Sequence, residues 1–351
     1  MINVEHRAAR RTAPPRLIGQ TWAVVLAGGD GTRLRSLTAD AGGQSVPKQY
    51  CSLRSGPSLL EEALVRAETV ADRERVCTVV AAQHRRWWAP LLAGVPRHNV
   101  IAQPQNRGTA NGMLLALSCV LDRDPLANVV VLPSDHCVRD ETTLCSAVHR
   151  SLRSLRAREA DVVLLGVAPE EADSELGYIV PSQRMSDAPV GVRKFVEKPP
   201  RREAAALIAA GALWNAFIVV AHALSLLDLL RAKDAALVER MRTAWRLDAQ
   251  ALSGYSAVAE LYRTLPALDF SRDIAEGRES SLSVMQVPPC GWSDLGTPER
   301  IVKALRRPVA VDAHPPVLSA AALSLEERLR QRQAASIERV ARCGAEPLSA
   351  S

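Results

Sequence analysis

The sequence is poor in aromatic residues and has no long apolar run. Aromatic residues make up 4% of the 351 residues, against 47% for hydrophobic residues as a whole, so aliphatic side chains must fill the core. No apolar run approaches the roughly 20 residues that a membrane-spanning helix needs. The N-terminus carries charge but no apolar stretch of signal-peptide length. We therefore expect no membrane partner, and one large domain with a smaller appendage.

Paired cysteines are also missing. The seven cysteines are scattered and odd in number, and they form no Cys-x-x-Cys pair. Several of them, such as Cys77 and Cys119, stand in apolar runs, where a thiol behaves as a small hydrophobe. This usage is typical of a reduced protein, and we expect a cytoplasmic one.

Charge of one sign dominates only near the N-terminus. The chain has 44 basic and 38 acidic residues, which gives a formal net charge of +6. Residues 1–20 are basic, contain a Pro-Pro pair and show no periodicity, so we predict a disordered tail. Because no nucleic-acid motif and no basic stripe interleaved with aromatics is present, we favour no nucleic-acid partner, and the charge alone leaves a nucleic-acid binder as an alternative. Basic residues also suit an enzyme whose substrates are anions.

Apolar runs alternate with helical segments along most of the chain. We interpret the apolar runs as strands at residues 22–26, 76–80, 99–102, 129–132, 161–167, 214–220 and 283–287. The strand, loop and helix alternation predicts an α/β fold with a doubly wound, mostly parallel, Rossmann-like sheet. We expect shorter strands at 177–180 and 192–199 to extend this sheet as a mixed sheet.

The predicted main domain covers residues 21–307. A proline-containing linker follows, and residues 318–342 form a weakly amphipathic pattern, so residues 308–351 are predicted to be a linker and a short helical C-terminal extension. Hexapeptide repeats are absent, which argues against a left-handed β-helix.

A glycine-rich turn follows the first predicted strand. Residues 26–33 (LAGGDGTR) place Gly28, Gly29 and Gly31 within four positions and end in Arg33. Such glycines allow successive backbone N–H groups to point into one anion-binding concavity, and arginine suits phosphate. Lys48 adds a second cation. The turn matches neither Gly-x-Gly-x-x-Gly nor a Walker loop, and a glycine-rich turn alone can be no more than a tight turn.

Two aspartates follow predicted strands. Asp135 ends the segment LPSD after the strand at 129–132, and Asp294 stands in the segment GWSDLG after the strand at 283–287. In such sheets ligands bind beyond the carboxyl ends of the strands, so we expect the glycine turn and Asp135 to lie near one another. Mg²⁺ prefers one or two carboxylates with phosphate oxygens and water, which both aspartates could supply. A lone strand-end aspartate can equally be a cap or turn residue.

Together, these segments resemble the signature of the sugar-1-phosphate nucleotidyltransferases, and they look most like the mannose-1-phosphate guanylyltransferases. The resemblance extends over roughly residues 22–305. It implies the nucleotidyltransferase type of sheet, Mg²⁺ as cofactor, and a nucleoside triphosphate (GTP) and a sugar 1-phosphate (mannose 1-phosphate) as substrates. The attacking phosphate oxygen is already ionised, so the reaction needs no general base and depends on cations that bring two anions together.

The resemblance also implies the roles of individual residues. It implies a nucleotide site formed by Leu26, Ala27, Gly28, Gly29, Gly31, Thr32, Arg33, Lys48, Gln103, Arg107, Gly108 and Thr109. The implied sugar-phosphate site consists of Gly177, Tyr178, Glu197, Lys198 and Asn215. The implied metal ligands are Asp135 and Asp294, and the implied catalytic residues are Arg33, Lys48, Asp135 and Lys198.

The sequence departs from the family pattern in two places. Asn111-Gly112 stands where the mannose enzymes usually carry Pro-Ala, and Ala216-Phe217-Ile218 stands where they usually read Ser-Gly-Met-Phe. These changes put base and sugar identity in doubt more than the reaction type. A related enzyme for another sugar, such as glucose 1-phosphate, and a catalytically silent regulatory subunit remain alternatives. For Trp214 we favour packing, and for His136 packing or hydrogen bonding. The sequence leaves a homo-oligomer open.

Overall fold

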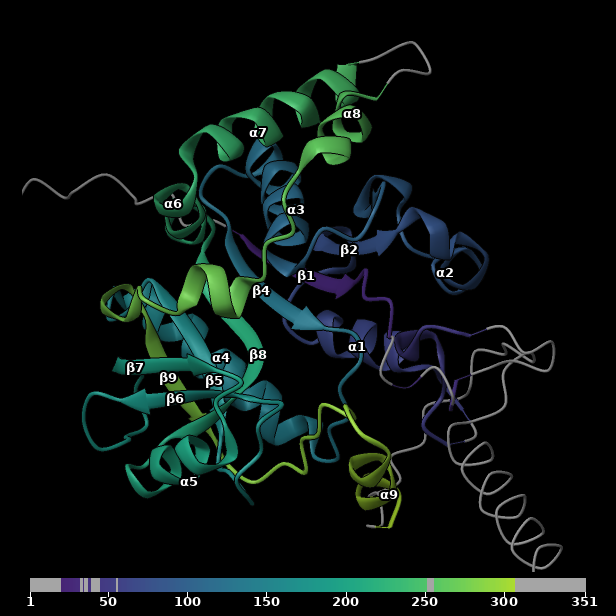
Figure 1. The fold of residues 1–351 in the computed structure, drawn as a ribbon. Helices are drawn as coiled ribbons and strands as arrows, with labels where there is room; N and C mark the ends of the chain where they lie inside the picture. Colours follow the sequence, from purple (N-terminus) through teal and green to yellow (C-terminus); the bar gives the residue numbers. More distant parts are fainter. Residues whose placement is uncertain are drawn as a thin grey trace, which may run out of the picture.

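The computed structural model of the chain describes residues 20–31, 34, 37–38, 45–54, 56–250 and 256–306. Within these ranges one sheet carries helices on both faces (Figure 1). Its strands are β1 (Thr21–Ala27), β2 (Val76–Ala81), β3 (Val100–Gln103), β4 (Asn128–Pro133), β5 (Val162–Val167), β6 (Gly177–Pro181), β7 (Val190–Glu197), β8 (Leu213–His222) and β9 (Ser283–Val287). The predicted segment 308–351 lies outside the described residues, as does the predicted tail apart from Gln20.

The α-helices alternate with the strands in the first half of the chain as the periodicity predicts, whereas α6, α7 and α8 follow one another after β8. They are α1 (Leu59–Glu68), α2 (Arg85–Leu91), α3 (Thr109–Arg123), α4 (Glu141–Ala157), α5 (Arg201–Ala209), α6 (Ala223–Lys233), α7 (Ala235–Gln250), α8 (Ala257–Thr264) and α9 (Pro298–Arg306). The 3-10 turns are η2 (Lys48–Tyr50), η3 (Arg73–Arg75), η4 (Ala82–His84), η5 (Arg97–Asn99) and η7 (Glu279–Ser281), and η6 (Phe270–Ala275) is a π-helix. None of the described helices is both long and apolar enough to cross a bilayer.

The N-terminal half of the sheet is parallel. The strand order is β3-β2-β1-β4-β8-β5-β9-β7-β6, and β3, β2, β1 and β4 pair in parallel with one another. These strands are apolar on both faces because helices cover each side. Because these strands are parallel, their carboxyl ends lie at one edge of the sheet. The α/β fold class predicted from the sequence is confirmed.

The other half of the sheet is mixed, as expected for the extension. β8 runs antiparallel to both β4 and β5, and β6 pairs with both β7 and β8. The register between β5 and β8 shifts between Leu164 and Gly166, opposite the stretch of β8 that contains Phe217. Phe217 has a φ of 54°, which is rare for a side chain of this size, so β8 bends where the two halves of the sheet meet.

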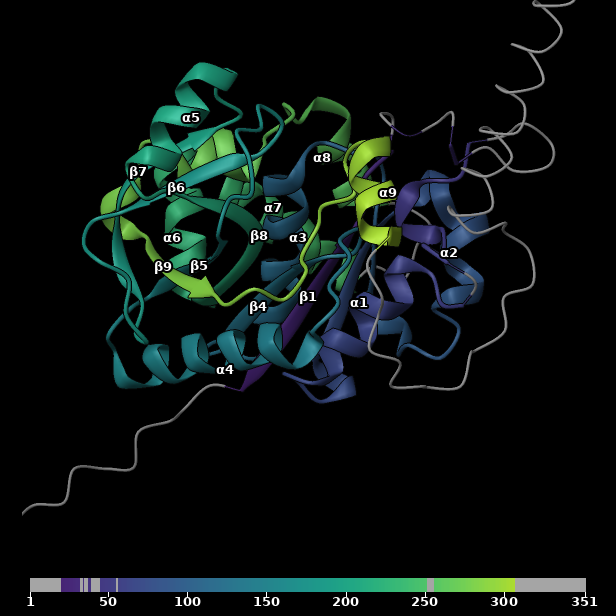
Figure 2. The ribbon, with the colours of Figure 1, turned by 90° about the horizontal axis from the view of Figure 1, so that it is seen from below.

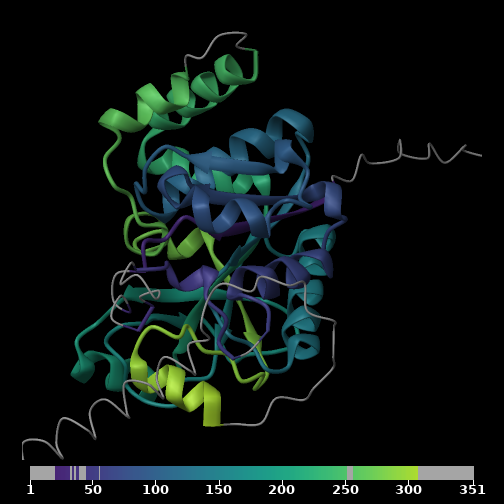
Figure 3. The same ribbon diagram turned by 90° about the vertical axis from the view of Figure 1, so that its right-hand side faces the viewer.

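Helices cover the two faces of the sheet with separate apolar cores. α1, α4, α5 and α9 contribute buried residues to one core, and Figure 2 shows α4 and α1 along that side of the strands. α3, α6, α7 and α8 contribute to the other core. Figure 3 shows α7 and α8 at one end of the molecule and α9 at the opposite end.

Local sequence signals account for several helix boundaries. Ser58 and Glu61 form a capping box at the start of α1, in which each side chain bonds the other residue's backbone N–H. α9 begins at Pro298, a residue typical of the first helical position, and the hydroxyl of Thr297 accepts a hydrogen bond from the backbone N–H of Arg300 at 3.3 Å.

Candidate active site

The glycine turn lies at the carboxyl end of β1 and is held there by η2. The side-chain amide of Gln49 donates to the backbone oxygens of Ala27 and Gly29 at 3.0 and 2.8 Å. The hydroxyl of Tyr50 also donates to Ala27 O, at 2.9 Å. These bonds place the cation-bearing segment directly beside the glycines, as the sequence predicts.

Gly31 is required by both the conformation and the space of this turn. Its φ is 60°, and a Cβ atom on it would lie 2.9 Å from the backbone nitrogen of Lys48. Gly29 has open space around the corresponding position. Close packing of the glycine turn against η2 therefore depends on Gly31. Thr32 and Arg33 lie outside the described residues, so their predicted roles stay predictions.

Lys48 connects the two predicted metal ligands. Its ammonium nitrogen lies 2.9 Å from Asp135 Oδ2 and donates to the backbone oxygen of Asp294 at 2.6 Å. The Lys48 side chain is 8% exposed, whereas that of Asp135 is 40% exposed. Enclosure by the protein opposes ionisation of Asp135, but the nearby positive charge, chiefly that of Lys48, together with hydrogen bonds holds the pKa of Asp135 below its ordinary value. The carboxylate is therefore charged and open on one side.

A short antiparallel bridge brings the two aspartate segments together. The backbone groups of Cys137 and Ser293 exchange two hydrogen bonds of 2.9 Å. Beside this bridge, the indole N–H of Trp292 donates to His136 Nδ1 at 3.2 Å, and the two rings meet edge to face. Burial lowers the pKa of His136 to about 4, so the ring is neutral at pH 7. His136 has the hydrogen-bonding position that the sequence favours over metal ligation.

The carboxylate of Asp294 is oriented by α9. Its Oδ1 pairs with the guanidinium of Arg300, whose other nitrogen lies 3.0 Å from Asp173 Oδ2. Asp294 is 9% exposed, and the next residue, Leu295, has a φ of 50°. The segment is therefore held in an unusual backbone conformation by contacts on both sides.

The donor set fits a divalent cation such as Mg²⁺. Asp135 and Asp294 each engage one carboxylate oxygen in an ion pair, and these are the hard oxygen ligands that Mg²⁺ prefers. Among the described residues no group of three or more histidines, cysteines and acids gathers to form a closed metal cage. Mg²⁺ typically takes one or two carboxylates and leaves its further positions to phosphate oxygens and water, so the donor types of these two residues suit it.

The segment after β3, which contains the predicted nucleotide-binding residues from Gln103 to Thr109, is tied to the glycine turn. Asn106 donates to the carboxylate of Asp30 at 3.0 Å, and Gln83 donates to the same carboxylate at 3.3 Å. Gln103 is 4% exposed, and its side-chain amide lies beside Gly28. The end of β3 and the end of β1 therefore form one wall of the site.

Arg107 and Thr109, predicted to bind nucleotide, are engaged by the protein itself. The Arg107 guanidinium donates to the backbone oxygens of Tyr262 and Arg263. The Thr109 hydroxyl donates to Asp269 at 3.2 Å and accepts from the backbone N–H of Phe270. In this structure both side chains hold the loop in place, and their contact with a nucleotide stays a prediction.

The sequence interpretation missed residues 265–276, which connect the two halves of the site. Ala110 N–H donates to Leu268 O, and Leu268 N–H donates to Arg107 O, so this segment runs alongside the loop after β3. At its other end, Asn215 donates to the hydroxyl of Ser271 at 3.3 Å. The local signal for this segment was Asp269, whose side chain caps η6. A π-helix such as η6 has no sequence signature of its own, so the rest of the segment could not be predicted from its sequence.

Four of the five predicted sugar-site residues gather near the ends of β6, β7 and β8. A Cβ on Gly177 would lie 2.5 Å from Glu197 Oε2 and 3.4 Å from Asn215 Cβ, so only glycine allows this approach. The ammonium nitrogen of Lys198 lies 3.6 Å from Glu197 Oε1, and the Lys198 side chain is 37% exposed. Burial, and then the charge of Asp269, raise the pKa of Glu197 above its ordinary value. The arrangement offers one cation and several hydrogen-bonding groups.

Tyr178 does not bring its side chain to this group. The ring is fully buried in the core on the other face, and its hydroxyl bonds the backbone N–H and oxygen of Asp173 at 2.8 and 2.9 Å. Successive residues of a strand point to opposite faces, so Gly177 and Tyr178 cannot both face the site. The prediction that Tyr178 contacts a sugar is therefore restricted to its backbone.

Unusual backbone conformations occur within three of the predicted motifs. Lys198, Phe217 and Leu295 all have positive φ, at 52°, 54° and 50°. Such conformations cost free energy in non-glycine residues and are concentrated at functional sites. Lys198 is held by a hydrogen bond from its backbone N–H to Leu176 O.

Comparisons with known proteins show which family the chain is similar to. The model of the nucleotidyl transferase family matches residues 22–308. The xanthan biosynthesis protein XanB of Xanthomonas campestris pv. campestris is 28% identical over 279 residues, which cover 78% of this chain and 57% of that protein. Mannose-1-phosphate guanylyltransferase 2 of Escherichia coli O157:H7 is 29% identical over 290 residues, covering 78% of this chain and 58% of that protein.

A solved structure is similar over a comparable length. The crystal structure of mannose-1-phosphate geranyltransferase from Thermus thermophilus has a TM-score of 0.67 and 27% sequence identity, and the match covers 82% of this chain and 80% of that chain. The chain spans about half the length of the curated relatives that it matches.

Proposed function

The chain belongs to the nucleotidyl transferase family, and on that premise we propose that it transfers a nucleotidyl group from a nucleoside triphosphate to a sugar 1-phosphate. We propose GTP and mannose 1-phosphate as the substrates, because the similar proteins include mannose-1-phosphate guanylyltransferases. The observation that carries the proposal is Lys48, which joins Asp135 to Asp294 directly beside the glycine turn.

In the proposed reaction, a phosphate oxygen of the sugar 1-phosphate attacks the α-phosphorus of the triphosphate. A new P–O bond forms, the bond between the α-phosphorus and its bridging oxygen to the β-phosphorus breaks, and pyrophosphate leaves with that electron pair. No proton must move, because the attacking oxygen is already ionised. The obstacle is the approach of two polyanions, and positioning together with fixed positive charge overcomes it.

Different residues bind the triphosphate, the sugar 1-phosphate and the metal ion in this proposal. Lys48, and Arg33 outside the described residues, hold the triphosphate against the backbone N–H groups of the glycine turn. Lys198 holds the phosphate of the sugar substrate, with Glu197 and Asn215 at its hydroxyl groups. Asp135 and Asp294 would hold Mg²⁺, which when bound supplies positive charge to phosphate oxygens.

Pyrophosphate release over a grid of nucleoside triphosphates and sugar 1-phosphates, with Mg²⁺, tests the proposal. Release with GTP and mannose 1-phosphate would support the specific assignment. Release only with another pair, such as one containing glucose 1-phosphate, would contradict the substrates but keep the reaction. Absence of release from folded protein that binds nucleotide would contradict the activity and favour a regulatory subunit of the same fold.

A further inference from the structure

A pocket that opens to solvent lies on the α9 side of Asp294. It measures about 540 Å³ and is formed by the loop after β5, the segment after β9 and α9. Of the described residues, neither the glycines of the turn nor Glu197, Lys198 and Asn215 line it. Apart from Asp294, the residues around this pocket therefore have no part in the proposed reaction.

Arg139 gives this pocket a positive charge that no described acid pairs with. Its guanidinium lies against Gly291, where a Cβ atom would come within 2.7 Å of Arg139 Cζ. Gly291 also has a φ of 66°, so both the space and the backbone conformation favour glycine there. Within the described part of the chain, the Arg139 side chain makes no hydrogen bond and no ion pair. Such a guanidinium is suited to a carboxylate, which it binds through two parallel hydrogen bonds.

Two further donors at the pocket lack a hydrogen-bond partner. Trp214 is 9% exposed, and its indole N–H makes no hydrogen bond with any described residue. Arg300 pairs with Asp294, and its Nη2 lies 3.0 Å from Asp173 Oδ2 but makes no hydrogen bond with the described residues. A buried donor without an acceptor costs free energy. These groups therefore favour a ligand that brings oxygen acceptors.

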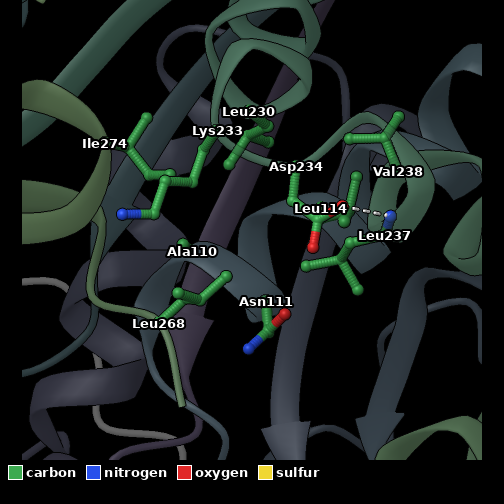
Figure 4. A pocket seen from close by; sticks show the side chains of 10 residues that line it. All are labelled: Ala110, Asn111, Leu114, Leu230, Lys233, Asp234, Leu237, Val238, Leu268 and Ile274. Atoms are coloured by element: carbon green, nitrogen blue, oxygen red, sulfur yellow. Dashed lines mark hydrogen bonds between the residues drawn. The ribbon is translucent and has the colours of Figure 1, made fainter. Parts of the chain in front are cut away.

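Another pocket has the opposite polarity. Figure 4 shows Asn111 at the edge of a pocket of about 220 Å³ between α3, α6 and α7. The amide nitrogen of Asn111 donates to the backbone oxygens of Arg107 and Pro266, whereas Asn111 Oδ1 has no partner among the described residues. The unsatisfied group there is an acceptor, which repels the oxygens of an acid. We therefore assign an acidic ligand to the pocket that contains Arg139 rather than to this one.

The acids of the Arg139 pocket indicate the rest of the ligand. The lining contains four acids and three cations: Glu170, Glu171, Asp173 and Asp294, and Arg139, Arg300 and Lys303. These charges nearly cancel, so the pocket suits a single negative charge rather than a polyphosphate. Glu171 is exposed and forms no ion pair with a described residue, and such a carboxylate accepts hydrogen bonds from hydroxyl groups. The rings of Trp214 and Trp292 add apolar faces.

We propose that this pocket is an effector site that binds a small hydroxylated carboxylic acid of the sugar-acid class. Arg139 and the indole N–H of Trp214 bind the carboxylate, Glu171 accepts from the hydroxyl groups, and the ring of the ligand packs against Trp292. The inference goes beyond the proposed function, because the ligand is neither a nucleotide nor a sugar phosphate and does not react.

Ligand-observed NMR titration of the full chain with galacturonate and galactose tests the proposal. Galactose has a hydroxymethyl group in place of the carboxylate. We expect galacturonate to bind with a dissociation constant of about 1 mM or below, and galactose at least about tenfold more weakly. Arg139→Met should weaken galacturonate binding at least about tenfold. Absence of galacturonate binding, equal binding of the two sugars, or unchanged galacturonate affinity in Arg139→Met would overturn the proposal.

Controls separate the pocket from general charge and from the substrate site. Lys233→Met removes a cation at the pocket of Figure 4 that forms no ion pair with the described residues, and it should leave galacturonate affinity unchanged. The melting temperature of Arg139→Met should equal that of the parent, because this side chain has no described partner to lose. Loss of galacturonate binding in Lys198→Met but not in Arg139→Met would place the acid in the proposed sugar-phosphate site and overturn the inference.

The outcomes also distinguish this inference from the proposed function. Galacturonate binding that is lost in Arg139→Met would support the inference even if the chain released no pyrophosphate with any substrate pair. Pyrophosphate release by a chain that does not bind galacturonate would keep the activity and overturn the inference.

Discussion

Glu62 is a partly buried acid whose ionisation destabilises the fold. It lies on α1 near the ion pair between Arg66 and Glu141, in which Arg66 donates twice to Glu141, at 2.8 and 2.6 Å. Burial raises the pKa of Glu62 from an ordinary 4.5 to about 7, although the charge of Arg66 acts in the opposite direction. Glu62→Gln keeps the shape of the side chain and removes its charge.

The direction of the pH dependence follows from proton binding. Below pH 4.5 Glu62 is protonated in both the folded and the unfolded chain, so it does not lower the free energy of unfolding. Between pH 4.5 and about 7 the unfolded chain loses this proton while the folded chain keeps it, so the free energy of unfolding falls as pH rises. At about 1.36 kcal/mol for each pH unit, the penalty above pH 7 reaches at most about 3 kcal/mol.

Urea unfolding of the full chain at pH 5 and pH 8 measures this effect. We expect Glu62→Gln to be more stable than the parent at pH 8 by up to about 3 kcal/mol, with a much smaller difference at pH 5. Glu68→Gln, on an exposed residue of the same helix, is the matched control and should change neither value by more than about 0.5 kcal/mol. Equal stability of Glu62→Gln and the parent at pH 8 would refute the reasoning.

Three further predictions concern the site itself. Gly31→Ala should lower the free energy of unfolding by about 1–3 kcal/mol, whereas Gly29→Ala, with open space around it, should have little effect; equal losses in urea unfolding would show that φ and Lys48 do not constrain Gly31. Asp135→Asn should weaken Mn²⁺ binding at least about tenfold, as measured by the paramagnetic resonance of free Mn²⁺, and unchanged affinity would remove Asp135 from the metal site. Lys48→Met should reduce kcat/KM for the triphosphate by about a hundredfold or more, and a variant with near-parental kcat/KM would exclude Lys48 from catalysis.

The sequence predicted those features that local patterns determine. Ser58 and Glu61 stand in the spacing of a capping box, and Pro298 stands at a first helical turn, so both helix starts were predictable. The approach of Asp135 to the glycine turn was also predictable, because parallel strands end at the same edge of a sheet. The likeness of the two aspartate segments to one family indicated that they belong to one site.

Other features depend on contacts between distant residues and have no local pattern. The direction of Tyr178 depends on the register of β6, and the mixed pairing of β8 depends on the bend near Phe217. The enclosure of Gln103 by Gly28 and Gly112 joins three segments far apart in the chain. The hydrogen bond from Tyr262 to Gln103 joins α8 to the end of β3, so composition and periodicity around Tyr262 could not reveal it.

The fate of the phosphate oxygens tests the central claim most directly. Mannose 1-phosphate that carries ¹⁸O in its three non-bridging phosphate oxygens is incubated with the chain, GTP and Mg²⁺. The products are then separated, and their masses are measured by mass spectrometry. Attack by the sugar phosphate on the α-phosphorus predicts that all the label appears in GDP-mannose and none in the pyrophosphate. Label in released phosphate or pyrophosphate, or no sugar nucleotide at all, would contradict the account.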